Sequence, residues 1–288
     1  MRLQDYDHGQ RFVATLLDTQ RITPADGVEV RELRLEVVAP DFRGTAGQSV
    51  GVIVPGPHAL GHEHHFRLYS LAADCEPDAS GIAHVTLCVR RCNYIDEYSG
   101  EEYRGVASNY LCDLQPGARI TINGPFGLPF EIPEDPATDL LLISMGTGIA
   151  PFRAFVAGLY RRHPHWQGKV LLFHGAMSGL ELLYMNDERD DFGEYYDRAT
   201  FQAFKALSPR PHWADPVAMD YAIEERAAEV QDMLAGDNCR VYVAGKSDIL
   251  DMLDKVFAGL AGSGDAWRER KEQLRAERID AVAYHAGM

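Results

Sequence analysis

The sequence is poor in cysteine, in positive charge and in long apolar runs. Its 288 residues include five cysteines, and 43 acidic residues outnumber the 28 lysines and arginines, which gives a formal net charge of −15. This excess of negative charge argues against nucleic acid or an anionic membrane surface as a partner. No run reaches the roughly 20 apolar residues that a membrane-spanning helix needs, and the N-terminus lacks the apolar segment of a signal peptide. We therefore expect no membrane insertion.

The cysteines are odd in number and lie in or beside apolar runs, as reduced thiols of a cytoplasmic protein do. Cys88 and Cys92 are four residues apart, and Cys112 follows twenty residues later. This spacing lacks the C-x4-C-x2-C core of a plant-type iron–sulfur centre. The histidines at 62, 64 and 65 have no second ligand group at helical spacing, so a solvated loop is favoured over a metal site.

Residues 1–130 have the pattern of a small antiparallel barrel. Six β-rich runs are separated by clusters of Gly, Pro and Asp, and several of them alternate apolar with polar residues. The clearest alternation sets Leu33, Leu35 and Val37 against Glu32, Arg34 and Glu36. The predicted strands are 12–22, 28–38, 49–54, 66–72, 83–92 and 118–122.

Residues 131–138 are predicted to be a linker, because the stretch 129–138 holds three prolines and three acidic residues. Strands then alternate with helices through residues 139–288, which indicates a doubly wound parallel sheet covered on both faces. The predicted strands are 139–145, 168–174, 240–244 and 280–284. The predicted helices are 151–162, 217–234, 248–260 and 266–278, and the polar, aromatic stretch 186–213 receives no regular element.

A turn with two glycines, Gly146 and Gly148, connects the first strand of this second domain to its first helix. Pro151 in the first helical turn has no N–H that would have needed an intrahelical partner. The free N–H groups and the positive dipole end of such a helix attract anions. The turn is therefore a candidate phosphate cradle, at the carboxyl edge where doubly wound sheets bind ligands. An ordinary strand–helix turn is the alternative.

A second stretch with chemical potential runs from Arg67 to Ser70. An arginine fork can pair with a phosphate, a tyrosine can stack on a flat ring, and a serine hydroxyl can bond a ring heteroatom. Arg67 and Tyr69 share one face of the strand because side chains alternate. Ordinary barrel packing with a surface salt bridge is the alternative interpretation.

These motifs, in this order, resemble those of plant-type ferredoxin–NADP(+) reductases, and the resemblance extends along nearly the whole chain. It implies a six-stranded FAD-binding barrel followed by an NAD(P)-binding domain. The matching segments are 67–70 (flavin motif), 87–91 with Tyr94 (adenine side), 105–114 (diphosphate loop and helix), 124–125 (closure of the barrel), 146–153 (nicotinamide-facing loop), 241–245 (a nucleotide-side strand) and 276–284 (the C-terminal strand).

The resemblance also implies site residues and an activity. Ser70, near the flavin N5, and Tyr284, stacked on the flavin, would be the catalytic residues, and hydride would pass between NADP(H) and FAD. Single electrons would pass to a ferredoxin or flavodoxin-like carrier. The implied cofactor-binding residues are Arg67, Leu68, Tyr69, Ser70, Cys88, Arg90, Tyr94, Gly105, Val106, Ala107, Ser108, Thr147, Gly148, Gly175, Ser208, Arg210, Tyr221, Gly245 and Tyr284.

The sequence departs from this family near the flavin and at the end of the chain. Ala244 and Val282 stand where the family commonly has Cys and Glu. We expect slower or differently tuned hydride exchange, because two groups beside the nicotinamide are missing. Four residues also follow Tyr284, which ends the chain in plant-type members. This tail can alter how Tyr284 moves, or it can be a frayed terminus.

The site for the coenzyme 2′-phosphate is a third departure. Ser208, Arg210 and Tyr221 are the candidates, and the lysine that the family uses has no counterpart, since Lys246 comes only after the next strand. Arg210 can still grip a phosphate with two hydrogen bonds, or it can be a solvated loop charge. NADP is therefore the expected coenzyme, and NAD is the alternative.

The acidic composition bears on the electron partner, because ferredoxins are acidic too. We expect a local basic patch to attract such a partner, because electrostatic steering of an approaching protein depends on the local field more than on the net charge. Two alternatives to a ferredoxin–NADP(+) reductase stay open: a reductase component of an oxygenase or larger electron-transfer complex, and a non-catalytic flavin relay subunit. The candidate patch residues are Arg90, Arg91, Arg104, Arg268, Arg270, Lys271, Arg275 and Arg278.

Overall fold

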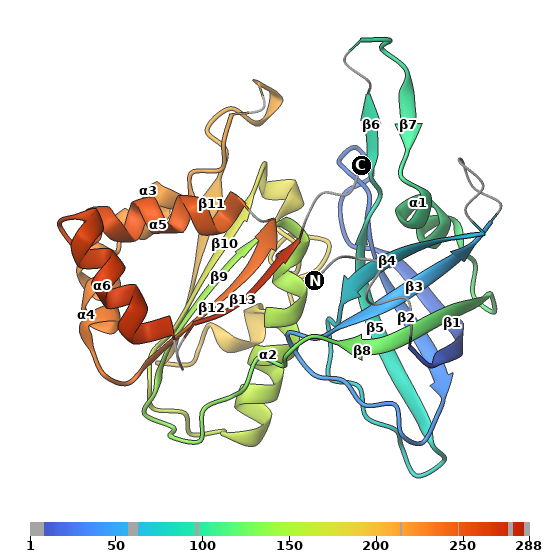
Figure 1. Ribbon diagram of the computed structural model, residues 1–288, viewed down its shortest axis with the longest axis horizontal. Helices are drawn as coiled ribbons and strands as arrows, with labels where there is room; N and C mark the ends of the chain where they lie inside the picture. Colours follow the sequence, from blue (N-terminus) through green and yellow to red (C-terminus); the bar gives the residue numbers. More distant parts are fainter. Residues whose placement is uncertain are drawn as a thin grey trace. The chain divides into compact units, whose positions relative to one another are not determined.

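The computed structural model describes residues 9–56, 63–95, 98–213, 215–246, 248–275 and 279–284. It divides into two compact units, of which the first is mainly the chain up to Glu131 and the second mainly the chain from Ile132 onward. Each unit is built on its own sheet, antiparallel in the first and parallel in the second (Figure 1). The fold is therefore the β plus α/β combination expected from the sequence.

The first unit is a six-stranded antiparallel barrel with the strand order β4-β3-β8-β1-β2-β5. A bridge between Leu71 and Leu87 joins the ends of that order, next to a hydrogen bond from the Ala72 N–H to the Thr86 carbonyl of 2.9 Å. All six predicted strands are present. They are β1 (Arg11–Arg21), β2 (Val30–Val38), β3 (Ser49–Pro55), β4 (His64–Ser70), β5 (Ile82–Arg90) and β8 (Arg119–Phe126).

The barrel core follows directly from the alternation in the sequence. In β2, Leu33, Leu35 and Val37 are buried and pack with Ala14 and Leu16 of β1. Alternate residues of a strand point to opposite faces, so one apolar set per strand fills the interior. The helix α1 (Val106–Asp113) contacts β3, β4 and β5 and closes the core with buried side chains at its own apolar positions.

A short hairpin between β5 and α1 was not among the predicted strands. It consists of β6 (Asn93–Ile95) and β7 (Glu102–Arg104), and Figure 1 shows it extending away from the barrel beside α1. Every residue of both strands is exposed. The hairpin therefore contributes nothing to the core, and the apolar periodicity that reveals core strands is absent from it.

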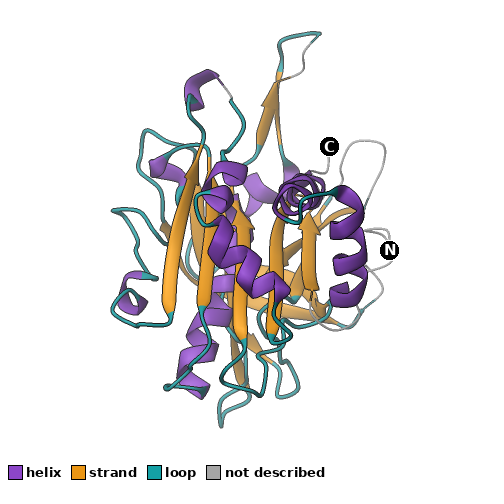
Figure 2. Ribbon diagram, turned by 90° about the vertical axis from the view of Figure 1, so that its left-hand side faces the viewer, coloured by secondary structure: helices purple, strands orange, loops and turns teal. Residues whose placement is uncertain are grey.

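The second unit is a five-stranded parallel sheet with the order β11-β10-β9-β12-β13. The chain winds outward from β9 in both directions, so the order reverses between β9 and β12, where such sheets bind ligands. Helix α2 lies on one face, and α3 to α6 cover the other (Figures 1 and 2). The strands are β9 (Asp139–Met145), β10 (Val170–Ala176), β11 (Phe201–Leu207), β12 (Cys239–Lys246) and β13 (Ile279–Tyr284).

Helices on both faces explain why β9 and β10 appear in the sequence as continuous apolar runs: every residue of β10 is buried. In the described part of the chain, no helix is long and apolar enough to cross a membrane. The α-helices are α2 (Ile149–Arg162), α3 (Met219–Glu224), α4 (Ala227–Ala235), α5 (Asp248–Leu260) and α6 (Gly264–Arg275). Short 3-10 helices are η3 (Gly146–Gly148), η4 (Gly179–Glu181), η5 (Gly193–Tyr195) and η6 (Pro211–Trp213).

Two predictions for the second unit are wrong. The stretch 186–213 contains a strand, β11, which lies at the edge of the sheet and is only partly buried, so Gln202 and Lys205 interrupt its apolar pattern. The single helix predicted at 217–234 is two helices, α3 and α4. Arg226 breaks it with a backbone at φ −116° and ψ 23°, and its guanidinium lies 4.7 Å from the centre of the Phe204 ring.

Candidate functional site

The β4 segment from Arg67 to Ser70 lies along the outer strand of the barrel sheet, paired with β3. Ser70 is 7% exposed, and its hydroxyl lies 3.3 Å from the hydroxyl of Ser49, its register partner. Tyr69 packs partly on the barrel core, and burial raises the pKa of its phenol. The Arg67 guanidinium donates to the Phe66 carbonyl at 3.0 Å. Leu68 is half-buried beside them. Ser49 is the contact that the sequence motif did not reveal.

Cys88 and Arg90 come from β5, which the Leu71–Leu87 bridge places beside the end of β4. Leu87 and Val89 point into the core, so Cys88 and Arg90 project from the opposite face of the strand. Cys88 is 5% exposed. The barrel closure thus brings the predicted flavin residues of β4 and the predicted adenine-side residues of β5 next to one another.

The N-terminus of α1 is shaped to receive a group close to its backbone. A β-carbon on Gly105 would lie 2.8 Å from the Cys92 carbonyl oxygen, so a side chain there would collide. No side chain caps the helix among the described residues. The N–H groups of Val106, Ala107 and Ser108 therefore remain available to an anion, as helix N-termini allow.

Side chains at this N-terminus fix the loop rather than face outward. The Ser108 hydroxyl accepts from the Cys92 N–H at 3.1 Å and lies 3.3 Å from the Gly105 carbonyl. The Asn109 amide donates to the Cys92 and Gly105 carbonyls and to Asn93 Oδ1 at 2.9–3.1 Å. Asn109 was not singled out from the sequence, although an Asn in the first helical turn commonly bonds nearby backbone.

Tyr94 lies on β6 and is 54% exposed. Its ring stacks on that of Tyr103 in β7, with 5.1 Å between centroids and 15° between planes. Tyr103 in turn donates its hydroxyl to Glu101 at 2.8 Å. The pair presents an aromatic surface that another flat ring can extend. Tyr103 was missed from the sequence because its partner lies across a hairpin that was not predicted.

The two glycines of the β9–α2 turn have different physical reasons. Gly146 has a φ of 55°, and a β-carbon there would meet nothing within 4 Å, so glycine serves the backbone conformation. A β-carbon on Gly148 would overlap the backbone carbonyl of Ala244 in β12. Gly148 is therefore a packing glycine between two segments of the sheet edge. Thr147, between them, is half-buried.

The other nicotinamide-side candidates gather at the same edge of the sheet. Gly175 pairs with Met145 of β9, and Gly245 follows Ala244 in β12. The space beside Gly175 is filled, because a β-carbon there would lie 2.9 Å from Met219 Cε and from Val217 Cγ1. Gly175 thus packs closely against the segment that opens α3.

The C-terminal strand places the two departures from the family pattern opposite each other. Ala244 of β12 is in register with Val282 of β13, and Lys246 is in register with Tyr284. Ala244 is fully buried. Beyond its backbone in β13, Tyr284 has no described side chain, and the tail 285–288 lies outside the described residues. Their predicted effects remain predictions.

A buried polar pair lies just before the Gly146 turn. Ser144 Oγ lies 2.9 Å from His174 Nδ1, and both side chains are fully buried. His174 Nε2 has no hydrogen-bonding partner among the described residues. Burial lowers the pKa of His174 to about 3, and a hydrogen bond with Ser144 opposes this shift without cancelling it. The ring is therefore neutral near neutral pH.

The predicted 2′-phosphate residues lie after β11 and on α3, and an unpredicted residue joins them. Ser208 is 6% exposed and donates its hydroxyl to the Asp215 carbonyl at 2.7 Å. Arg210 donates from Nε to Asp215 Oδ2 at 2.7 Å. Tyr221 is 67% exposed on α3. Asp215 thus contacts two of the three candidates. The only feature of the sequence that could have indicated the contact with Arg210 is the short spacing of five residues between the two.

One cation of the expected basic patch, Arg91, is neutralised within the barrel. Arg91 donates to Glu29 at 2.7 Å, to Asp113 at 2.8 Å and to Asn109 at 2.9 Å. These hydrogen bonds raise the pKa of Arg91 further. Burial would raise the pKa of Glu29, but hydrogen bonds from Arg91 and Arg31 outweigh it and lower that pKa. Arg91 therefore acts as a structural link between β5, α1 and the start of β2.

The cations of α6 have local partners as well. Arg270 donates to the carbonyls of Leu234 and Gly236 at the end of α4, and Arg268 pairs with Asp265 at 2.9 Å. Lys271 donates to Asp254 at 2.6 Å. The side chains of Arg275 and Arg278 lie outside the described residues, while Arg104 is exposed on β7 and Arg90 is half-buried. Two cations of α6, Arg268 and Lys271, are thus paired with carboxylates, which weakens the positive field that the sequence suggested for this helix.

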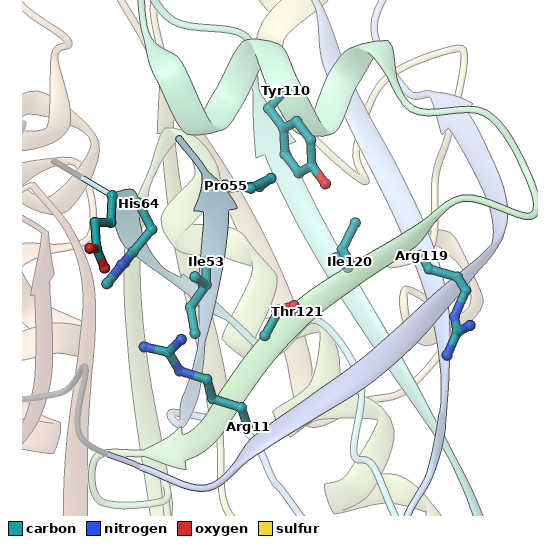
Figure 3. Close-up of a pocket in the computed structure, with 9 residues that line it drawn as sticks. Arg11, Ile53, Pro55, His64, Tyr110, Arg119, Ile120 and Thr121 are labelled. Atoms are coloured by element: carbon teal, nitrogen blue, oxygen red, sulfur yellow. The ribbon is translucent and has the colours of Figure 1, made fainter. Parts of the chain in front are cut away.

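The described barrel also contains a hollow of about 330 Å³ that holds none of the predicted site residues (Figure 3). Its walls come from β1, β3, β8, α1 and the start of β4, and include Arg11, His64, Tyr110 and Arg119.

All five cysteines are free thiols. Among the described residues, no group of three or more His, Cys, Asp or Glu can hold a metal ion.

Comparisons with known proteins agree with this arrangement. Residues 142–255 match the model of the oxidoreductase NAD-binding domain family. The chain is 34% identical over 247 residues to the leaf-type chloroplastic ferredoxin–NADP reductase of Nicotiana tabacum, covering 83% of this chain and 67% of that protein. It is 30% identical over 272 residues to the ferredoxin–NADP reductase of a Spirulina species, covering 92% of each.

The chain spans only about two thirds of several other relatives, such as 66% of the enzyme from Spinacia oleracea. Among solved structures, the ferredoxin–NADP+ reductase of Plasmodium falciparum superposes with a TM-score of 0.70 at 16% identity, covering 95% of this chain and 96% of that one. The same enzyme with 2′P-AMP gives 0.70 at 19% identity, covering 96% and 97%. These structures establish the fold.

Proposed function

This chain belongs to the ferredoxin–NADP reductase family, and we propose that it is an FAD-dependent oxidoreductase that exchanges hydride with NADP(H) and single electrons with a ferredoxin-like protein. A bound flavin supplies the link between two-electron and one-electron chemistry. The observation that best supports the proposal is the uncapped N-terminus of α1, a helix that contacts both β4, which carries the flavin motif, and β5, which carries the adenine-side residues.

The barrel residues fit an FAD. Arg67 would pair with the diphosphate, and the N–H groups at the start of α1 would add donors without competing side chains. Gly105 keeps that approach open, since any side chain there would meet the Cys92 carbonyl. Tyr69 would lie along the isoalloxazine, and the Tyr94–Tyr103 stack would take the adenine.

The Ser49–Ser70 pair would orient a hydroxyl group so that it donates a hydrogen bond to the flavin N5. When Ser70 donates outward to the flavin N5, its oxygen can accept from Ser49, 3.3 Å away. Both hydroxyls are buried, so this relay is shielded from water. Ser49 would thus be a positioning residue that sets the orientation of the Ser70 hydroxyl. Nicotinamide would be oriented by Thr147 and the carboxyl ends of β9 and β12.

The first test is spectroscopic. Purified protein should be yellow, should bleach under anaerobic NADPH and should then reduce an artificial one-electron acceptor. A yellow protein that neither NADPH nor NADH bleaches would contradict the reductase proposal and favour a non-catalytic relay subunit. A protein that bleaches but transfers no electrons to any ferredoxin or flavodoxin would favour a component of an oxygenase or larger complex.

The replacement of the family's cysteine by Ala244 provides a second test. Ala244 is fully buried in register with Val282, so the two departures act at one place. Ala244→Cys should change the rate of flavin reduction by NADPH measured in a stopped-flow instrument, while Ala258→Cys, on α5, should not. An Ala244→Cys protein with an unchanged reduction rate would show that this position does not tune hydride exchange.

A cytoplasmic location belongs to the proposal as well. Its support is that all five cysteines are free thiols, as is usual in reducing compartments. Cell fractionation with an antibody to the chain tests it, and recovery in the membrane pellet would contradict it. The same fractions, run on a sizing column, test whether the chain travels alone or in a larger redox complex.

A further inference from the structure

Asp215 accepts hydrogen bonds from Ser208 and Arg210, the two donors that the coenzyme 2′-phosphate would need. The Ser208 hydroxyl has one proton, and it donates that proton to the Asp215 carbonyl oxygen at 2.7 Å. Ser208 is 6% exposed, so its hydroxyl has little freedom to turn toward another acceptor. A phosphate could accept from Ser208 only after the Asp215 backbone has given up this bond.

Arg210 is engaged by the same residue. Its Nε donates to Asp215 Oδ2 at 2.7 Å, and its Nη2 lies 3.4 Å from Oδ1, so the carboxylate lies side-on to the guanidinium. This edge of the arginine is one that matches the oxygens of a phosphate. The carboxylate therefore occupies one edge of Arg210 to which a phosphate could bind, and it carries the same sign of charge.

The loop that holds Asp215 is closed at both ends. The Ser208 N–H donates to the Ala176 carbonyl at 3.3 Å, and the Ala218 N–H donates to the Leu207 carbonyl at 3.2 Å. These bonds anchor the segment to β10 and β11, at the carboxyl edge of the sheet. The segment that holds Asp215 is therefore tied to the sheet at Ser208 and at Ala218, in addition to the ion pair that Asp215 makes with Arg210.

We infer that Asp215 determines coenzyme specificity, by holding a carboxylate in the place of the 2′-phosphate and so weakening the preference for NADP(H) over NAD(H). The inference rests on the proposed function, since it assigns a nucleotide to this edge. A 2′-phosphate must displace the carboxylate and then face its negative charge. The 2′-hydroxyl of NAD(H) can instead donate to it, as carboxylates do in many dinucleotide sites.

The test compares two nucleotides that differ at this position. Asp215→Asn keeps the shape and the backbone carbonyl but removes the charge. Calorimetry on the purified flavoprotein should show 2′P-AMP binding about tenfold tighter than to the parent protein, the scale of one charge-assisted contact. Binding of 5′-AMP should stay the same or weaken. Asp215→Ala should shift the ratio of the two affinities in the same direction.

Glu225→Gln is the matched control, because it removes one exposed negative charge at the C-terminal end of α3, outside the loop that holds Asp215. It should leave the ratio of affinities unchanged, and an equal shift in this variant would overturn the inference by showing a general charge effect. An unchanged or lowered 2′P-AMP affinity in both Asp215 variants, with flavin still bleached by NADPH, would overturn the inference alone. Absence of nucleotide binding and of bleaching in the parent protein would overturn the proposed function with it.

Discussion

At the scale of single residues, the buried hydroxyl pair Ser49–Ser70 gives the sharpest prediction. Ser70→Ala should slow flavin reduction by NADPH about a hundredfold, the usual cost of one preorganised donor. Ser49→Ala should slow it about fivefold, because only the hydroxyl that orients Ser70 is lost, a neutral hydrogen bond of about 1 kcal/mol. Stopped-flow absorbance measures both rates.

The control for this pair is Ser80→Ala, in an exposed turn of the same barrel. Its reduction rate should equal that of the parent. If Ser49→Ala also matched the parent while Ser70→Ala slowed the reaction, Ser70 would act without the relay. An equal, large loss in both serine variants, accompanied by loss of bound flavin, would indicate damage to the barrel.

His174 gives a second residue-level prediction, on stability in acid. Burial lowers the pKa of His174 from 6.5 to about 3. Between these two pH values His174 is therefore protonated in the unfolded chain and neutral in the folded chain. Unfolding free energy must then fall with falling pH, by about 1.4 kcal/mol per pH unit from this group. His174→Leu should remove that slope, giving about 2 kcal/mol less loss between pH 6.5 and pH 5.

Urea unfolding at several pH values measures this difference. His84→Gln serves as the control, because His84 is exposed on β5, and it should follow the parent curve. A His174→Leu protein whose stability falls with pH as steeply as the parent's would mean that His174 takes up its proton in the folded state, through water or a local opening. Above pH 7 the two proteins should differ by packing and by the lost hydrogen bond between Ser144 and His174, and not by protonation, since the His174 ring is then largely neutral in the folded and the unfolded chain.

At the scale of elements, the β9–α2 turn separates two kinds of glycine. Gly148→Ala should lower the free energy of unfolding by about 3 kcal/mol or more, because its β-carbon would overlap the Ala244 carbonyl and neither backbone can yield without strain. Gly146→Ala should cost about 1–2 kcal/mol, since it has open space and only the positive φ to tolerate. Urea titration followed by far-ultraviolet circular dichroism measures both.

The order of the two effects is the test. Equal losses, or a larger one for Gly146→Ala, would contradict the close packing of Gly148 on β12. Gly179→Ala is the control, because a β-carbon there meets nothing within 4 Å and its φ is not positive. It should leave stability nearly unchanged, within about 0.5 kcal/mol.

Which elements the sequence could predict follows from what surrounds them. The six barrel strands and β9 were predictable because burial on one or both faces imprints a period of two or a continuous apolar run. Edge strand β11 and hairpin β6–β7 bury few side chains, so their sequences lack the apolar pattern that predicts a strand. The break between α3 and α4 depends on where Arg226 meets Phe204, a contact between segments 22 residues apart in sequence.

At the scale of the whole molecule, charge decides how a partner is met. The net charge is −15, and Arg91, Arg268 and Lys271 are each paired with a carboxylate. We therefore predict that reduction of an acidic ferredoxin will not slow as salt rises from about 50 to about 300 mM, and will quicken if repulsion dominates the encounter. Cytochrome-coupled turnover at several ionic strengths measures it.

A rate that falls steeply with salt would contradict this prediction. It would locate an attractive basic surface, with the exposed Arg104 as the first candidate. Arg104→Gln would then flatten the salt dependence. Reduction of a small neutral acceptor provides the control, because its encounter with the protein is insensitive to ionic strength.

The sequence by itself determined the two fold classes, the order of the motifs and the turn chemistry, because periodicity, glycine and proline act on their own neighbours in the chain. The tertiary structure decided which side chains meet. It paired Ser49 with Ser70, stacked Tyr94 on Tyr103 and packed Gly148 against Ala244. It also placed Asp215 against two residues proposed to bind a phosphate. Ser208 donates to the Asp215 carbonyl, and Arg210 donates to its carboxylate. The contacts of Ser49 with Ser70 and of Gly148 with Ala244 join segments far apart in the sequence, and no local pattern in the chain encodes them.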